Sequence, residues 1–199
     1  MRFQKIISTI LHPIVIPTIG VLLYFLFIPH RIQKSQQLAL LSLIFVATYL
    51  VPLLVLILLK SFKSIKSFNV YSIKERKIPV LLMIVLFYVL GNALTKISVA
   101  KDFGILFYAT VFSLIIVYLL FTIRFKTSLH MLSMGNAIGF FLVLGIRYTI
   151  SVLPVIIGFI LLSGLLASSR LHLKAHTVKE IYTGFFLGII SPFLIFYFL

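Results

Sequence analysis

Three short polar stretches carry the residues able to do chemistry in an otherwise apolar sequence, and the first spans residues 169–180. His176 and Glu180 lie four residues apart, so a helix that begins near residue 175 would place both on one face. A carboxylate that accepts a hydrogen bond from one imidazole nitrogen fixes the tautomer and leaves the other nitrogen as a base or nucleophile. Arg170 adds a fork of donors suited to a phosphate or carboxylate. The same spacing is equally typical of a polar cluster flanking a membrane helix.

The second stretch, residues 126–130, precedes an apolar segment. Ser128 is placed to cap the helix that would follow, and the free N–H groups of that helix end would then face an anion. His130 is placed to donate a proton to a leaving oxygen. On its own, a capped helix with a flanking histidine is also a common structural arrangement.

The third stretch, residues 74–79, holds three cations within four residues, Lys74, Arg76 and Lys77. Such a cluster suits a polyanion, and it equally marks the cytoplasmic end of a membrane helix. Glu75 is interpreted as neutralising its neighbours. Nothing in the sequence separates the three cations from one another, so all three are candidates for binding phosphate.

The amino-acid composition indicates the class of protein that contains these three polar stretches. Hydrophobic residues make up 62% of the 199 positions and charged residues 11%, against ~45–50% and ~25% in soluble domains. An ordinary soluble domain and a disordered chain are therefore excluded. The net charge of +15 does not indicate nucleic-acid binding, because most of the chain is too apolar to lie in water. The absence of cysteine excludes disulfides, thiolate catalysis and Cys-ligated metals.

We therefore predict an all-α, polytopic bundle of about six or seven membrane-spanning helices. A span needs ~20 mainly apolar residues, and the first apolar run is interpreted as a retained span rather than a cleaved signal peptide. Residues 1–199 form one integral membrane domain, with N-terminal helices in 1–59 and the polar stretches in 60–199. The seven candidate segments are 11–29, 38–59, 79–95, 103–123, 131–146, 151–168 and 180–199.

Pairs of spans separate the three polar stretches, which therefore reach the same side of the membrane. Most of the 18 Lys and Arg residues fall on that side, which the positive-inside rule would make cytoplasmic. The rule loses force if several of these cations bind a ligand. Outside the stretches, His12 and His30 are assigned no function, Asp102 is interpreted as an ordinary loop residue and Arg147 as snorkelling to the far interface.

The first stretch resembles a motif of the type-2 phosphatidic acid phosphatase superfamily, membrane-embedded lipid phosphatases related to vanadium haloperoxidases. The third motif of that family is Ser-Arg, five residues, His, three residues, Asp. This chain has Ser169 and Arg170, five residues, His176, three residues and then Glu180 in the place of Asp.

The other two stretches match the family in order and broad spacing. The second family motif is Pro-Ser-Gly-His, and residues 127–130 keep its Ser and His with Leu129 in the place of Gly. The first motif is Lys, six residues, Arg-Pro, and residues 74–79 keep its basic character and the proline. The resemblance covers roughly residues 60–199, and the third motif is its most specific part.

The resemblance implies a catalytic role for three residues. His176 would attack the phosphorus and form a phosphohistidine, Glu180 would orient His176, and His130 would protonate the leaving oxygen and then activate water. Arg170, Ser128 and the cations of the third stretch would hold the phosphate oxygens. Those cations are Lys74, Arg76 and Lys77.

The resemblance also implies a metal-independent hydrolase without cofactor. Its partner would be a membrane lipid that bears a phosphate or diphosphate, such as polyprenyl diphosphate, phosphatidylglycerol phosphate, phosphatidic acid or lipid A phosphate. Bacterial members that act on envelope lipids usually lie in the inner membrane with the site facing the periplasm, and that side is expected here.

Three alternatives stay open. A protein of the same fold could bind or transport a lipid phosphate without cleaving it, or it could pass the phosphoryl group to a second lipid. A metal site is the third, because His172, His176 and Glu180 are spaced i, i+4, i+8 and would share one helical face. Arg170 and Lys174 argue against that site, since they would repel a cation.

Overall fold

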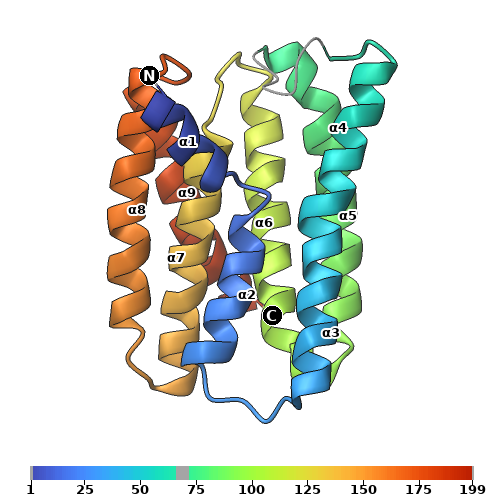
Figure 1. The fold of residues 1–199 in the computed structure, drawn as a ribbon, viewed down its shortest axis with the longest axis vertical. Helices are drawn as coiled ribbons and strands as arrows, with labels where there is room; N and C mark the ends of the chain where they lie inside the picture. The colour runs from blue at the N-terminus through green and yellow to red at the C-terminus, as the bar shows by residue number, and fades with distance from the viewer. Residues whose placement is uncertain (1, 66–71, 199) are drawn as a thin grey trace.

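The computed structural model describes residues 2–65 and 72–198, and within these ranges the chain is all-helical (Figure 1). Two short irregular turns, the π-helical η1 (Val46–Leu50) and the 3₁₀ helix η2 (Ser98–Ala100), accompany the α-helices. The α-helices are α1 (Arg2–Ile10), α2 (Ile16–Phe27), α3 (Lys34–Phe45), α4 (Val51–Ser61), α5 (Ile73–Thr95), α6 (Lys101–Leu120), α7 (Leu129–Tyr148), α8 (Leu153–His172) and α9 (Val178–Phe198).

Six helical segments are long and apolar enough to cross a membrane, so the protein is an integral membrane protein. The first of them, Lys34–Ser61, joins α3, η1 and α4 into one continuous span. The other five are α5, α7, α8, α9 and the run Ser98–Leu120, which contains α6. The bundle of about six spans predicted from composition is thus confirmed.

The prediction that residues 11–29 span the membrane is wrong, because the helix in this segment, α2, is too short. Helix α2 has 12 residues, or roughly 18 Å, which falls short of the ~30 Å hydrocarbon core. The chain breaks between α1 and α2 around Pro13, whose ring removes a backbone donor and disfavours helical geometry in the residue before it. Residues 2–10 form the separate helix α1, which packs beside α8 (Figure 1).

Helices α7 and α9 pack against each other more extensively than any other pair, because glycines line their contact. A side chain at Gly184 would collide with the Ser128 carbonyl oxygen, and one at Gly188 with that of Leu132. Small residues allow such close backbone approach between membrane helices. The contact holds the start of α7 against the first turn of α9, where the Ser128 N–H donates to the Glu180 carbonyl oxygen at 3.2 Å.

Replacing Gly188 by alanine is expected to destabilise the protein by about 1–3 kcal/mol, because the added methyl group overpacks the α7–α9 contact. Gly164 on α8 is the matched control, since a methyl group there meets no atom within 4 Å. Thermal unfolding in detergent should show a lower midpoint for Gly188→Ala and an unchanged or higher one for Gly164→Ala. Equal midpoints for the two variants would contradict this description of the packing.

Asp102 holds the far end of the bundle together, although its sequence position predicts an ordinary loop residue. The structure places it in the first turn of α6, where it is buried. Its Oδ2 accepts hydrogen bonds from the hydroxyls of Tyr24 at 2.8 Å and Tyr148 at 2.6 Å, and Arg147 lies 3.4 Å from its Oδ1. Asp102 therefore ties α2, α6 and α7 together, and Arg147 has an ion-pair partner as well as access to the interface.

Candidate functional site

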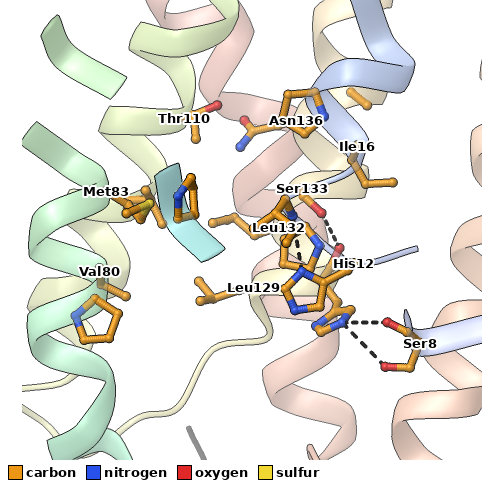
Figure 2. Close-up of a pocket in the computed structure, with 18 of the residues that line it drawn as sticks. Ser8, His12, Ile16, Val80, Met83, Thr110, Leu129, Leu132, Ser133 and Asn136 are labelled. Atoms are coloured by element: carbon orange, nitrogen blue, oxygen red, sulfur yellow. Dashed lines mark hydrogen bonds between the residues drawn. The ribbon is translucent and has the colours of Figure 1, made fainter. Parts of the chain in front are cut away.

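The three polar stretches meet at one end of the bundle, the end that also carries α1 (Figure 1). They line a cavity of about 580 Å³ with a polar mouth and a long apolar wall. Residues of the wall are drawn in Figure 2, from Ser8 and His12 near the mouth to Thr110 and Asn136 deeper in. The polar residues at the mouth are Lys5, Ser8, Arg76, Lys126, His130, Arg170 and His176.

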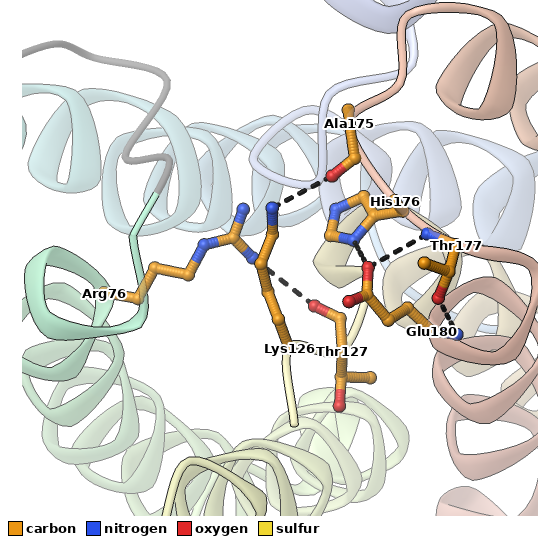
Figure 3. Close-up of polar contacts among 7 residues, drawn as sticks. All are labelled: Arg76, Lys126, Thr127, Ala175, His176, Thr177 and Glu180. Atoms are coloured by element: carbon orange, nitrogen blue, oxygen red, sulfur yellow. Dashed lines mark hydrogen bonds and ion pairs between the residues drawn. The ribbon is translucent and has the colours of Figure 1, made fainter. Parts of the chain in front are cut away.

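His176 and Glu180 form the pair that their spacing predicted, although by a different local structure. Helix α9 begins at Val178, so His176 lies in the turn before the helix and not on its face. The Glu180 Oε2 is 2.7 Å from the His176 Nδ1 and accepts the Thr177 N–H at 3.1 Å (Figure 3). The Glu180 N–H in turn donates to the Thr177 Oγ1 at 3.4 Å. Thr177 and Glu180 are therefore a capping box, which fixes the carboxylate before it meets the imidazole.

The hydrogen bond to Glu180 sets the chemistry of His176. An ionised carboxylate only accepts, so the His176 Nδ1 carries the proton and the lone pair lies on Nε2. Burial lowers the pKa of His176 to about 3, and the cations Arg76, Arg170 and Lys126 lower it in the same direction. The imidazole is therefore neutral at ordinary pH, with its Nε2 available as a nucleophile.

Of the three candidate cations on α5, Arg76 lines the cavity and is buried. Its Nη1 donates to the Thr127 carbonyl oxygen at 3.4 Å (Figure 3). Lys74 and Lys77 are exposed and lie outside the cavity lining. Successive helical residues are about 100° apart, so a helix that aims Arg76 inward turns both lysines away. The structure thus corrects the assignment of Lys74 and Lys77 to the phosphate site.

Lys126 is a site residue that the sequence reading did not select. Its Nζ donates to the Ala175 carbonyl oxygen at 3.0 Å, which holds the ammonium group beside the His176 turn (Figure 3). Burial and then the charge of Arg76 lower the pKa of Lys126. Arg76, Lys126 and Arg170 thus line one cavity mouth together with the exposed Lys5, and Glu180 lies behind His176. This excess of positive charge suits an anion.

Ser128 occupies the N-cap position of α7, but the expected side-chain capping bond is absent. Its Oγ is buried and has no hydrogen-bond partner among the described residues, and the same holds for the Thr127 Oγ1. Neither residue is among those that line the cavity, so the structure does not place these hydroxyls at the proposed phosphate site, although Ser128 is a candidate there by sequence. The start of α7 also offers the backbone N–H groups that favour an anion.

His130 is buried at the start of α7, and the N-terminal helix meets it there. Its Nε2 lies 3.1 Å from the Ser8 carbonyl oxygen and 3.5 Å from the Ser8 Oγ. A carbonyl oxygen only accepts, so the Nε2 of His130 carries a proton in this arrangement. The Arg170 Nη1 donates to the Ser8 Oγ at 2.8 Å, and the ring of His12 meets that of His130 edge-on at 5.0 Å.

The sequence reading therefore missed the contribution of the first twelve residues, where Lys5, Ser8 and His12 line the cavity. The spacing of apolar residues along α1 is the sequence feature that indicates this contribution. Its apolar residues Phe3, Ile6 and Ile10 recur with helical spacing and are exposed, whereas Ser8 on another face of the helix is buried. Burial lowers the pKa of His12 to about 4, so its ring is neutral beside His130.

The metal alternative is not supported by the described residues, which contain no group of three His, Asp or Glu side chains able to hold an ion. His172 ends α8 and is exposed, whereas His176 lies in the following turn and Glu180 in α9. The three residues do not share one helical face, because the chain leaves the helix between them. The predicted i, i+4, i+8 ligand set is therefore wrong.

Comparison of the chain with family models, curated proteins and solved structures gives no significant match. The fold and the site define an integral membrane helical protein whose cavity joins a carboxylate-held histidine, Arg76, Lys126 and Arg170 to an apolar interior.

Proposed function

We propose that this protein is a metal-independent phosphatase that removes a phosphate or diphosphate group from a membrane lipid through a phosphohistidine intermediate. The observation that carries the proposal is the His176–Glu180 pair, which leaves a neutral imidazole nitrogen beside three cations. The sequence resemblance to the type-2 phosphatidic acid phosphatases supports the same reaction, and we extend the proposal to a phosphatase-type helical core.

In the first step, the His176 Nε2 attacks the phosphorus and the bond from phosphorus to the lipid oxygen breaks. Glu180 stabilises the positive charge that develops on the ring, because it accepts the Nδ1 proton at 2.7 Å. Arg76, Lys126 and Arg170 balance the charge on the phosphoryl oxygens, which is the main requirement of phosphoryl transfer. His130 acts here in its imidazolium form, which gives the Nε2 proton to the leaving lipid oxygen and becomes neutral.

In the second step, water attacks the phosphohistidine and the phosphorus–nitrogen bond breaks. His130, now without the proton it donated, accepts one from the water. Phosphate leaves and His176 returns to its neutral form.

The shape of the cavity supports a lipid substrate. From His130 to Phe140 its wall follows α7 over roughly 15 Å, and most of the deeper lining is apolar. A lipid chain lying there would keep its phosphate at the mouth, among the cations. Polyprenyl diphosphate, phosphatidylglycerol phosphate, phosphatidic acid and lipid A phosphate all have this form.

We further propose that the protein lies in a bacterial inner membrane with the site facing the periplasm. The positive-inside rule compares the numbers of Lys and Arg residues on the two sides of the membrane. Cations that bind phosphate do not report on topology, and leaving them out of that comparison weakens the bias towards a cytoplasmic site. A reporter enzyme fused after residue 199 tests the side, because α9 leads away from the site. A cytoplasmic C-terminus supports a periplasmic site, and a periplasmic C-terminus overturns it.

The direct test of the function is phosphate release by the purified protein in detergent, with a strong chelator present. The panel should pair lipid phosphates with head groups that lack the apolar chain, such as phosphatidic acid with glycerol phosphate. We expect release from at least one lipid and a much lower kcat/KM for its chain-free counterpart. An inert protein, or activity lost with the chelator, would contradict the proposal.

A lipid-phosphate binding or transport protein is the second candidate. The contact that favours it is the one between the His130 Nε2 and the Ser8 carbonyl oxygen, which occupies the proton donor that hydrolysis needs. Binding of the lipid without release of phosphate would identify this function, and transfer of phosphate to a second lipid would identify a phosphotransferase.

Glu180→Gln is expected to lower kcat by roughly 10²-fold while the protein keeps most of its stability. Glutamine still completes a capping box with Thr177 and still accepts from the His176 Nδ1, but it carries no charge to stabilise the ring. Glu180→Ala is the comparison, because it removes both interactions and should also lower the thermal midpoint. Unchanged kcat in Glu180→Gln would leave Glu180 with a capping role alone.

A further inference from the structure

Helix α1 lies beside the cavity mouth and has two different faces, one that lines the cavity and one that is apolar and exposed. Lys5, Ser8 and Thr9 line the cavity, whereas Phe3, Ile6 and Ile10 are exposed. An amphipathic helix of this kind lies in the membrane interface, with its apolar side against the acyl chains. Helix α1 thus contacts the lipid on one side and the site on the other.

Ser8 is the residue through which α1 reaches the site, and it is buried. Its Oγ accepts from the Arg170 Nη1 at 2.8 Å, and its carbonyl oxygen accepts from the His130 Nε2 at 3.1 Å. The proposed reaction requires the same two donors for a phosphoryl oxygen and for the leaving lipid oxygen. Two oxygens of Ser8 therefore occupy donors that the substrate would need.

The connection between α1 and the bundle permits α1 to move as a unit. The helix has nine residues and is followed by a break at residues 11–15 that contains Pro13. Isolated helices of this length are marginal, and most of their stability comes from packing. Helix α1 packs chiefly on α8, the helix that carries Arg170.

We propose that α1 is an autoinhibitory lid in which Ser8 takes the place of two substrate oxygens, so that phosphate binding displaces Ser8 from Arg170 and His130. The identity of the ligand in this proposal rests on the proposed function. Phe3, Ile6 and Ile10 keep α1 in the membrane interface as it moves, and a lipid that enters the cavity laterally opens the site by exchanging its oxygens for those of Ser8.

Hydrogen exchange at the amides of α1 tests the lid without any assay of turnover. The wild-type protein in lipid nanodiscs is compared with and without saturating inorganic phosphate, which serves as the probe. The lid predicts several-fold faster exchange in residues 2–10 with phosphate, while the core of α7 is unchanged. Equal or slower exchange in residues 2–10 would overturn it, because Ser8 would then remain in place when the anion binds.

Ser8→Ala tests the same contact through affinity and activity. Loss of the Oγ leaves the free state without its hydrogen bond to Arg170, so phosphate should bind on the order of tenfold more tightly. With a lipid substrate, KM should fall by a similar factor. Thr122→Ala is the matched control, since Thr122 is exposed, lies outside the cavity lining and bonds through its hydroxyl to the Leu119 carbonyl oxygen, so no change is expected. Weaker phosphate binding by Ser8→Ala would make Ser8 a ligand for the phosphate and would overturn the lid.

The two proposals fail in different ways. If no lipid phosphate is cleaved by the wild type or by Ser8→Ala, but phosphate still accelerates exchange in α1, the phosphatase is wrong and the lid holds. If lipid phosphate is cleaved and phosphate leaves α1 unchanged, the lid is wrong and the phosphatase holds.

Discussion

Replacing His176 by alanine is expected to lower the rate of phosphate release from lipid by roughly four orders of magnitude or more. The reason is that the proposed reaction passes through a bond between phosphorus and the His176 Nε2, and alanine offers no nucleophile in its place. The cation cluster would remain, so the variant should still bind the lipid phosphate. The measurement is phosphate release in detergent, together with binding of the same lipid.

The chain offers a matched control for this variant four residues earlier. His172 ends α8 and is exposed, so His172→Ala should keep its activity within about twofold. Thermal unfolding of both variants establishes that the loss does not come from unfolding. Activity above one hundredth of the wild-type value in a folded His176→Ala variant would rule out His176 as the nucleophile.

Replacing Arg76 by alanine is expected to lower kcat/KM by 10²- to 10³-fold, the magnitude typical of a lost donor to a charge that develops in the transition state. Arg76 is buried at the cavity mouth, where its charge is poorly screened by water. Arg76→Lys should retain part of the activity, because it keeps the charge but loses the planar fork. Phosphate release at several lipid concentrations separates the effect on kcat from that on KM.

Lys74 and Lys77 are the controls for the Arg76 variants. They lie on the same helix within two residues of Arg76 but are exposed and outside the cavity lining. Each alanine substitution should therefore leave kcat/KM within about twofold. A loss at Lys74 or Lys77 as large as that at Arg76 would mean that the charge of the whole surface matters, and not a phosphate site at Arg76.

Much of the fold followed from composition and apolar length. A membrane bundle was required by 62% hydrophobic residues, and six of the predicted segments are membrane-spanning helices. The first segment failed because hydropathy does not register where a helix stops. Residues 11–29 are apolar throughout most of their length, yet Pro13 lies where α1 and α2 separate.

The candidate site was predictable where one short segment contained the partners. His176 and Glu180 meet because a capping box at Thr177 brings them together, and the sequence Thr177–Glu180 carries the signature of that box. The choice of Arg76 over its two neighbours depends on which face of α5 turns inward, which follows from packing against distant helices. The contacts of Ser8 with His130 and Arg170 join residues 122 and 162 positions apart, and no local pattern encodes them.

The phosphohistidine itself provides the most direct test of the proposed reaction. The protein is mixed with a lipid carrying labelled phosphate, quenched in alkali, digested and examined by mass spectrometry, with His176→Ala as the control. We predict an acid-labile, alkali-stable phosphate on the Nε2 of His176 in the wild type and no phosphate at that position in the variant. Turnover of the lipid with no phosphate on His176, or with the phosphate on another residue, would contradict the account.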